Sequence, residues 1–123
     1  MSAADRFREA VEARDPDAAV ALLAPDVVFR SPAVHRPYEG AEAVSRLLRT
    51  VMEVFEDFRY TTQLGGDEVH ALIFSARVGD RELQGLDLIV EDGEGRITEL
   101  TVMVRPLSGL SALAQEMAAR LAA

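Results

Sequence analysis

Asp87 is the residue whose surroundings point most directly to chemistry. It lies within the run 86–90 (LDLIV), which is apolar on both faces, so we expect a strand residue there to be buried on one side. Burial disfavours an ionised carboxylate, so the acid either stays protonated or finds a donor. A neutral acid can donate a hydrogen bond to a developing enolate, and a carboxylate of raised pKa can act as a base near neutral pH. The alternative is that Asp87 has a structural role, in which an arginine or backbone groups satisfy its buried carboxylate.

Three further side chains could assist Asp87 in acid–base work, although their spacing is not diagnostic. His35 lies in an expected loop, where an exposed position is the competing interpretation. His70 begins an expected strand, where a surface or rim position competes with one in a pocket. Tyr38 follows a proline, and there it can equally be a packing lid.

Several kinds of active site are excluded by the residues that are missing. The chain has no Cys, which removes thiol nucleophiles and thiolate metal sites. It has no Lys, which removes Schiff-base and P-loop chemistry. Two His cannot form a three-His metal site, and no serine sits in a Gly-x-Ser-x-Gly nucleophile elbow. We therefore expect no metal and no cofactor.

The charge balance restricts the partners. Thirteen basic residues face twenty-one acidic ones, a formal charge of −8, which disfavours nucleic acid and anionic membrane surfaces as partners. No stretch approaches eighteen apolar residues, and the N-terminus lacks a basic-then-apolar leader. We expect a cytoplasmic protein of one domain, residues 1–123, because this length suits a single core.

The helices and strands that must position these side chains are predicted from the periodicity of the apolar residues. Helical spacing predicts a helix capped by Ser2, a second helix that starts at Asp15 and closes at Pro25, and a long amphipathic helix ending near Phe55. A strand is expected at residues 27–30 and a loop at residues 31–40.

From Phe58 onward the apolar period changes to two. Four strands joined by short Gly- and Asp-rich turns predict an antiparallel meander, followed by a final helix over residues 107–123. The order predicts an α+β domain in which a strongly curved, mostly antiparallel sheet wraps around the N-terminal helices. Such an arrangement leaves a cavity between sheet and helices.

The chain resembles the SnoaL-like branch of the nuclear-transport-factor-2-like (NTF2-like) superfamily over roughly residues 4 to 106. The resemblance rests on residues 14–17 (RDPD), 22–29 (LLAPDVVF), 37–40 (PYEG) and 92–97 (DGEGRI). It implies a cone-shaped α+β barrel with a hydrophobic pocket, commonly dimeric. Family members include ketosteroid isomerases, polyketide cyclases, epoxide hydrolases and non-catalytic binding modules, so the fold alone does not choose the function.

The resemblance assigns roles that this chain fills only in part. Asp87 occupies the position of the oxyanion-hole acid of ketosteroid isomerases. Ser31, followed by a proline, stands where that family carries its general-base Asp, and Phe7 stands where it carries a Tyr donor. Gly85 stands where epoxide hydrolases carry an Arg two residues before the acid. The isomerase triad is therefore incomplete, and an epoxide hydrolase is a weaker alternative.

The pocket lining is predicted from alternation and aromatic content, with ordinary core packing as the alternative for each residue. The predicted ligand-binding residues are Phe29, Ser31, His35, Tyr38, Phe55, Phe58, Phe74, Leu100, Val102 and Val104. A pocket lined in this way favours a flat or hydrophobic small molecule.

The leading hypothesis is a small-molecule-binding domain; if it is an enzyme, it is an isomerase or a polyketide cyclase acting beside a carbonyl, with Asp87 central. The alternative is a non-catalytic hydrophobic-ligand-binding or oligomerisation module. A second polar group converging with Asp87 in the cavity would distinguish the two. The family resemblance and the Val- and Leu-rich sheet also predict a homodimer.

Overall fold

The computed structural model describes residues 1–122 and contains four helices and six strands. In chain order these are α1 (Ala3–Glu12), α2 (Pro16–Val20), β1 (Leu23–Arg30), β2 (Tyr38–Glu39), α3 (Ala41–Val54), β3 (Glu56–Gly65), β4 (Val69–Val78), β5 (Arg81–Glu91), β6 (Ile97–Arg105) and α4 (Leu107–Ala122). The predicted α+β class is confirmed.

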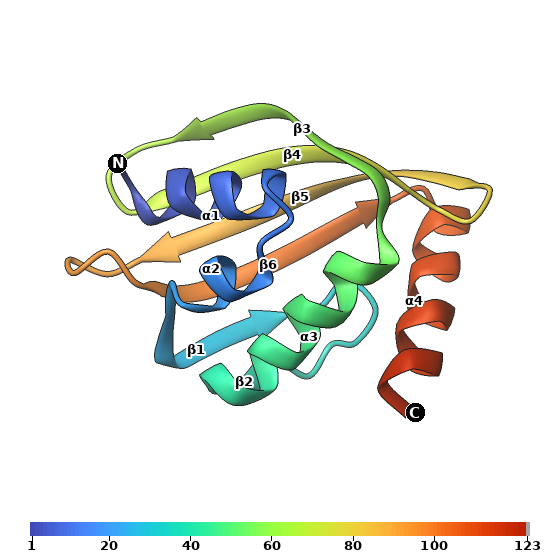
Figure 1. Cartoon of the computed structure of the whole chain (residues 1–123), viewed down its shortest axis with the longest axis horizontal. Helices are drawn as coiled ribbons and strands as arrows, with labels where there is room; N and C mark the ends of the chain where they lie inside the picture. Colours follow the sequence, from blue (N-terminus) through green and yellow to red (C-terminus); the bar gives the residue numbers. More distant parts are fainter. Residues whose placement is uncertain (123) are drawn as a thin grey trace.

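The strands form one curved sheet in the order β2-β1-β6-β5-β4-β3 (Figure 1). The predicted antiparallel meander comprises β3 to β6, and β1 joins it parallel to β6. The sheet is open, because β2 and β3 are its two edges. Its curvature gives the inner face a hollow into which helices pack.

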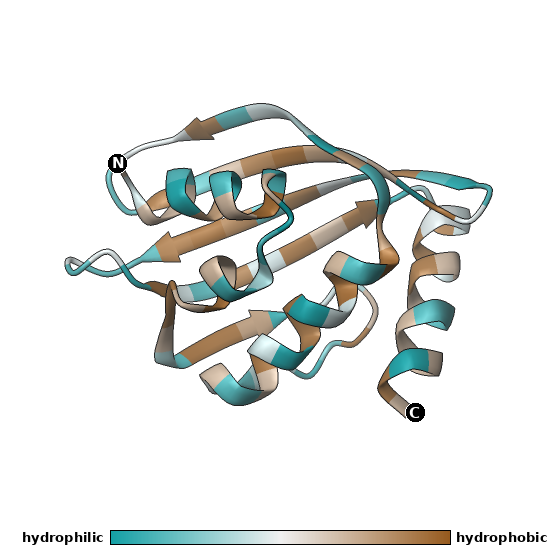
Figure 2. Cartoon of the chain, in the orientation of Figure 1, coloured by the Kyte–Doolittle hydropathy of each residue, from teal (hydrophilic) through white to brown (hydrophobic). Residues whose placement is uncertain are grey.

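The N-terminal helices and α3 cover this inner face (Figure 1). α1 begins with a capping box, in which Ser2 and Asp5 satisfy each other's backbone amides and the apolar side of the helix, including Phe7, turns toward the sheet. α3 buries Val44, Leu47 and Leu48 in the same way. Figure 2 shows the hydrophobic residues concentrated along the central strands and on one side of these helices.

The final helix α4 crosses one end of the sheet, away from α1 (Figure 1). Gly109 allows the close approach, since a β-carbon there would lie 2.7 Å from Cβ of Leu83 and 2.9 Å from the Glu82 carbonyl. The C-terminal end of α4 is held to α3, because Arg46 donates to the Leu121 carbonyl at 2.7 Å. Residue 123, the last of the predicted helix, lies outside the described residues.

Two expected boundaries were wrong. Pro25 does not end the second helix, which stops at Val20, but lies within β1. The pairing of β1 with β6 is irregular between Leu23 and Val28, and a residue without an amide hydrogen is tolerated at such a break. The expected loop at residues 31–40 contains the short strand β2, which pairs antiparallel with β1.

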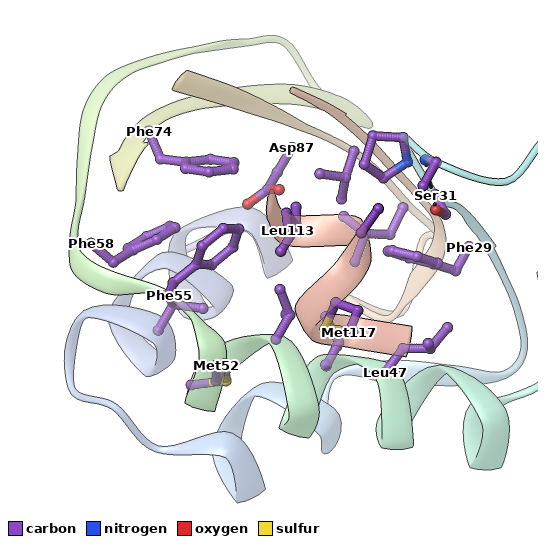
Figure 3. Close-up of a pocket in the computed structure, with 18 of the residues that line it drawn as sticks. Phe29, Ser31, Leu47, Met52, Phe55, Phe58, Phe74, Asp87, Leu113 and Met117 are labelled. Carbon is purple, nitrogen blue, oxygen red and sulfur yellow. Dashed lines mark hydrogen bonds between the residues drawn. The ribbon is translucent and has the colours of Figure 1, made fainter. Parts of the chain in front are cut away.

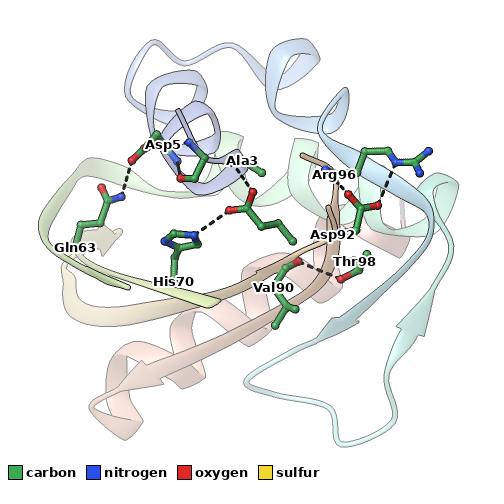
Figure 4. A network of polar contacts seen from close by, with 10 residues as sticks. Ala3, Asp5, Gln63, His70, Val90, Asp92, Arg96 and Thr98 are labelled. Carbon is green, nitrogen blue, oxygen red and sulfur yellow. Dashed lines mark hydrogen bonds and ion pairs between the residues drawn. The ribbon is translucent and has the colours of Figure 1, made fainter. Parts of the chain in front are cut away.

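A buried polar contact fixes the start of α1. Oε2 of Glu91 accepts the Ala3 amide at 3.1 Å, and Oε1 of Glu91 lies 2.9 Å from Nε2 of His70 (Figure 4). Both side chains are buried. The carboxylate thereby satisfies one of the free amides at the helix N-terminus and ties α1 to β4 and β5.

Candidate functional site

A cavity of about 430 Å³ lies between the inner face of the sheet and α1, α3 and α4. Its walls are predominantly apolar, as Figure 3 shows for the part around Phe55, Met52 and Leu113. The lining residues with polar side chains are Glu12, Arg14, Ser31, Tyr38, Tyr60 and Asp87. The volume suits a small organic ligand.

Asp87 lies on the sheet side of this cavity, and only 7% of its surface is exposed. It faces inward because alternate residues of β5, including Gly85 and Ile89, are buried on the helix-covered side. Its Oδ2 accepts a hydrogen bond of 2.8 Å from the hydroxyl of Tyr60. Its Oδ1 has no hydrogen-bond partner within the described residues, yet it is not among the fully enclosed unpaired atoms, so it keeps accessible surface.

The apolar surroundings change the proton affinity of this carboxyl. Burial raises the pKa of Asp87 from its ordinary value of 3.8 to about 7, and the hydrogen bond from Tyr60 opposes this rise. No ion pair to Asp87 forms with any described cation. Burial, followed by the nearby Asp87 charge, raises the pKa of Tyr60 well above its ordinary value, so the phenol remains a donor. Asp87 can therefore both release and accept a proton near neutral pH.

A cluster of aromatic rings holds the side chain of Tyr60, whose hydroxyl donates to Asp87. Phe74 and Phe58 stack at 4.8 Å, and Tyr60 meets Phe58 edge-on at 4.9 Å. Phe74 lies opposite Gly85 in the sheet register, and a methyl group added at Gly85 would overlap the Phe74 ring. The missing side chain at Gly85 thus leaves room for the ring beside Asp87, so that the acid faces hydrocarbon there.

Eight of the ten predicted ligand-binding residues contribute to the cavity wall, and their role in binding stays a prediction. Those that line the cavity are Phe29, Ser31, Tyr38, Phe55, Phe58, Phe74, Leu100 and Val102. Asp87 lines it with them.

Two of the predicted binding residues lie elsewhere. Val104 is outside the cavity lining and packs against the core near the end of β6, where α4 begins. His35 is exposed, because only the first half of its loop, residues 31–34, reaches the cavity. His70, considered as an assisting group, is instead buried beside Glu91 and does not line the cavity. Neither histidine can assist Asp87 directly.

Tyr60 is the functional residue that the sequence reasoning missed. Its signal was available, since Tyr60 alternates with Phe58 along a strand and therefore shares its face. Its pairing with Asp87 was not accessible, because the two residues come from strands that are not neighbours. The final helix α4 also supplies part of the cavity wall, through Leu113 and Met117.

The Ser31 hydroxyl has a structural role. Its oxygen accepts the backbone amides of Ala33 and Val34 at 3.0 and 3.3 Å, which shapes the loop at the cavity edge.

In the part of the chain that the structure describes, no group of three or more acidic or histidine side chains could hold a metal ion. No helix there has the length and hydropathy needed to cross a membrane.

The family comparison matches the described fold. A family model described as a SnoaL-like domain matches residues 4–99. No curated protein gives a significant match.

Solved structures similar to the chain agree with this family. A steroid delta-isomerase from Pseudomonas aeruginosa is 50% identical, with a TM-score of 0.93, and the match covers 98% of this chain and 89% of that one. An uncharacterised bacterial protein with a cystatin-like fold from Silicibacter pomeroyi DSS-3 is 34% identical, with a TM-score of 0.93 and coverage of 98% and 85%. An NTF2-like protein of unknown function from Cytophaga hutchinsonii ATCC 33406 is 20% identical, with a TM-score of 0.66 and coverage of 85% and 88%; this last likeness concerns the fold alone.

Proposed function

The chain belongs to the SnoaL-like domain family, and from that premise we propose that it binds a hydrophobic small molecule with a carbonyl group and isomerises it by moving a proton. Asp87 carries the proton. One observation carries the proposal: a buried carboxyl with Oδ2 held by Tyr60 and Oδ1 left without a described partner, in an apolar cavity. The similarity to a steroid delta-isomerase supports the same class of reaction.

The reaction needs one group that changes its protonation state and returns to it. Oδ1 of ionised Asp87 removes a proton from the carbon beside the carbonyl, and the electron pair of that C–H bond moves onto the carbonyl oxygen as an enolate. The neutral acid then returns the proton to a different carbon of the conjugated system. The product is an isomer, and Asp87 is again ionised, so no net proton is gained or lost.

The polar side chains at and beside Asp87 favour isomerisation over the other reactions of the family. With a pKa of about 7, Asp87 is present in both forms at neutral pH. Tyr60 stays protonated, so it orients Asp87 but does not exchange protons with a substrate. An epoxide-type hydrolase would need a cation where Gly85 offers none. A cyclisation, which relies on several acid–base groups, fits a site with a single proton carrier less well.

The test is conversion of a β,γ-unsaturated ketosteroid to its conjugated isomer, followed by ultraviolet absorbance. Wild-type protein should convert it, and Asp87→Asn should lose at least about a hundred-fold in rate, the usual contribution of a general base. Asp26→Asn is the matched control, because Asp26 is an exposed carboxylate outside the cavity lining. Equal rates in wild type and Asp87→Asn would overturn the proposal.

A second candidate function is non-catalytic binding of a hydrophobic ligand. Ser31 favours it, since the family's general-base position holds a hydroxyl engaged with two backbone amides. The same experiment separates the two functions. A protein that binds the ketosteroid tightly but leaves it unconverted, with Asp87→Asn unchanged in affinity, belongs to the binding class.

We also propose that two copies associate through the outer face of the sheet. Eight apolar residues lie on that side, and we call them the outer apolar face: Leu64, Val69, Ala71, Ile73, Leu86, Leu88, Val90 and Met103. Leu64, Val69 and Met103 are 61%, 48% and 53% exposed.

The size of that side of the sheet suits a second copy of the chain. Strands β3 to β6 have 9 to 11 residues each. At about 3.3 Å per residue and about 4.8 Å between strands, they present roughly 600 Å² in projection. This is comparable with the roughly 800 Å² that each partner contributes to a standard interface.

A further inference from the structure

Arg14 is held at the edge of the cavity by the way α1 ends. Its backbone is left-handed, with φ of 56°. The Arg14 amide donates to the Val11 carbonyl at 3.0 Å, and the next amide, of Asp15, donates to the Ala10 carbonyl at 2.9 Å. These bonds close the helix and fix the backbone from which the guanidinium projects. Arg14 is among the residues that line the cavity containing Asp87.

A second, smaller hollow adjoins the cavity at this edge. It measures about 270 Å³ and is lined by Arg14, Pro16, Arg49, Met52 and Glu53. Arg14 and Met52 line both spaces, so the two hollows lie next to each other there. Figure 3 shows Met52 on the α3 side of the cavity, across from Asp87 on the sheet side. The smaller hollow therefore lies at the end of the cavity away from the proton carrier.

The acidic side chains at this edge already have cationic partners. Glu12, which lines the cavity, lies 3.3 Å from Nε of Arg8. Glu53, which lines the smaller hollow, lies 3.4 Å from Nη1 of Arg120. Each carboxylate is thus paired with an arginine from outside the two hollows, and Arg120 also pairs with Glu116 at 3.0 Å.

The two arginines of the smaller hollow differ in how they are paired. Arg49 pairs with Asp17 at 2.7 Å, but the Asp17 side chain is 83% exposed, which weakens the pair through solvent screening. Arg14 forms no ion pair or side-chain hydrogen bond with any described residue. Among the charged residues that line the smaller hollow, Arg14 is therefore the one with no described ion-pair partner. A guanidinium presents a planar set of donors that matches a carboxylate, sulfonate or phosphate.

We propose that the natural ligand is an amphipathic anion. Its apolar body fills the cavity, its carbonyl end meets Asp87, and its anionic group lies in the smaller hollow against Arg14, with Arg49 as a weaker second contact. This inference rests on the proposed function for the use of the cavity, but it does not require the ligand to be isomerised. It adds the chemical class of the substrate, a hydrophobic carbonyl compound that carries a carboxylate or a similar group.

Two fluorescent probes of the same ring system test the inference. One is 8-anilinonaphthalene-1-sulfonate, and the other is N-phenyl-1-naphthylamine, which lacks the sulfonate. Arg14→Gln should weaken the sulfonate probe about five-fold, the effect of one partly exposed ion pair, and leave the neutral probe within about two-fold. Arg49→Gln should act in the same direction with a smaller effect. Added salt should weaken only the sulfonate probe.

Arg36→Gln is the matched control, because it removes the same charge from an exposed loop residue that lines neither hollow. It should leave both probes unchanged. If Arg14→Gln changes the two probes equally, or not at all, the anionic group is ruled out while the apolar cavity remains supported by binding of the neutral probe. If neither probe binds wild-type protein, both the cavity as a ligand site and this inference fail.

Discussion

The hydroxyl of Tyr60 donates a 2.8 Å hydrogen bond to Oδ2 of Asp87 across an intervening strand. Tyr60 belongs to β3 and Asp87 to β5, with β4 between them. The curvature of the sheet allows the Tyr60 side chain to reach that far, while the space over Gly85 is taken by the Phe74 ring. One oxygen of the carboxyl is thereby committed to the protein, and the other remains for a ligand.

Ionisation of Asp87 should destabilise the fold. Because its pKa is raised from 3.8 to about 7 on folding, the native protein keeps the proton that the unfolded chain releases. The contribution of protonated Asp87 to the free energy of unfolding is fully present below about pH 4 and is lost as the pH rises through about 7. This loss amounts to at most on the order of 4 kcal/mol. Asp87→Asn should remove this slope and be more stable than wild type at about pH 8.

Urea denaturation at about pH 5 and about pH 8 measures this effect directly. Asp26→Asn, at an exposed position, should keep the wild-type dependence. The prediction is wrong if wild type and Asp87→Asn lose equal stability between the two pH values.

Removing the donor should make Asp87 harder to ionise. The Tyr60 hydrogen bond lowers the pKa of Asp87, so Tyr60→Phe should raise that pKa by about one unit, the size expected for a hydrogen bond to a charged group. The pH at which isomerisation reaches half its maximal rate should move upward by the same amount. Tyr38→Phe, which alters another cavity-lining tyrosine, should not move it. An unchanged midpoint in Tyr60→Phe would show that the phenol does not act on the carboxylate.

A side chain at Gly85 should disturb the aromatic cluster. Gly85→Ala places a methyl group against the Phe74 ring and should cost about 1–3 kcal/mol of stability. Combining it with Phe74→Leu should cost less than the sum of the two single changes, because the smaller side chain makes room. Gly66→Ala is the control, since a β-carbon added at Gly66 would point into open space, with no atom beyond its chain neighbours within 4 Å. Strict additivity of the two changes in urea denaturation would contradict the close contact.

A charge on the outer apolar face should separate the two copies. Met103→Glu places a carboxylate within the proposed interface, where burial would be costly. Sedimentation velocity at tens of micromolar, a concentration suited to modest interfaces, should show a dimer for wild type and a monomer for this variant. Leu107→Glu is the control, because Leu107 is 78% exposed at the start of α4 and off that face. If the wild-type protein is a monomer at this concentration, the proposed dimer is contradicted.

The sequence was sufficient for features that depend on neighbours along the chain. Capping at Ser2 and alternation from Phe58 onward predicted α1 and the meander, because these signals act within a few residues. Burial of Asp87 was predictable from the apolar residues on both sides of it. The pairing of Tyr60 with Asp87 was not, because it depends on curvature across three strands. The same limit applies to Val104, which faces inward opposite Gly85 as its alternation predicts but packs on the core, where α4 lies against the end of β6, and does not line the cavity.

The most direct measurement is the titration of the Asp87 carboxyl carbon by ¹³C NMR in the folded protein, assigned with Asp87→Asn. We predict a midpoint near pH 7, well separated from those of the exposed carboxylates, and a displacement of that midpoint when a ligand fills the cavity. A midpoint near about pH 4, the ordinary value for an aspartate, would mean that water reaches the carboxyl freely, and Asp87 would then be no proton carrier at neutral pH.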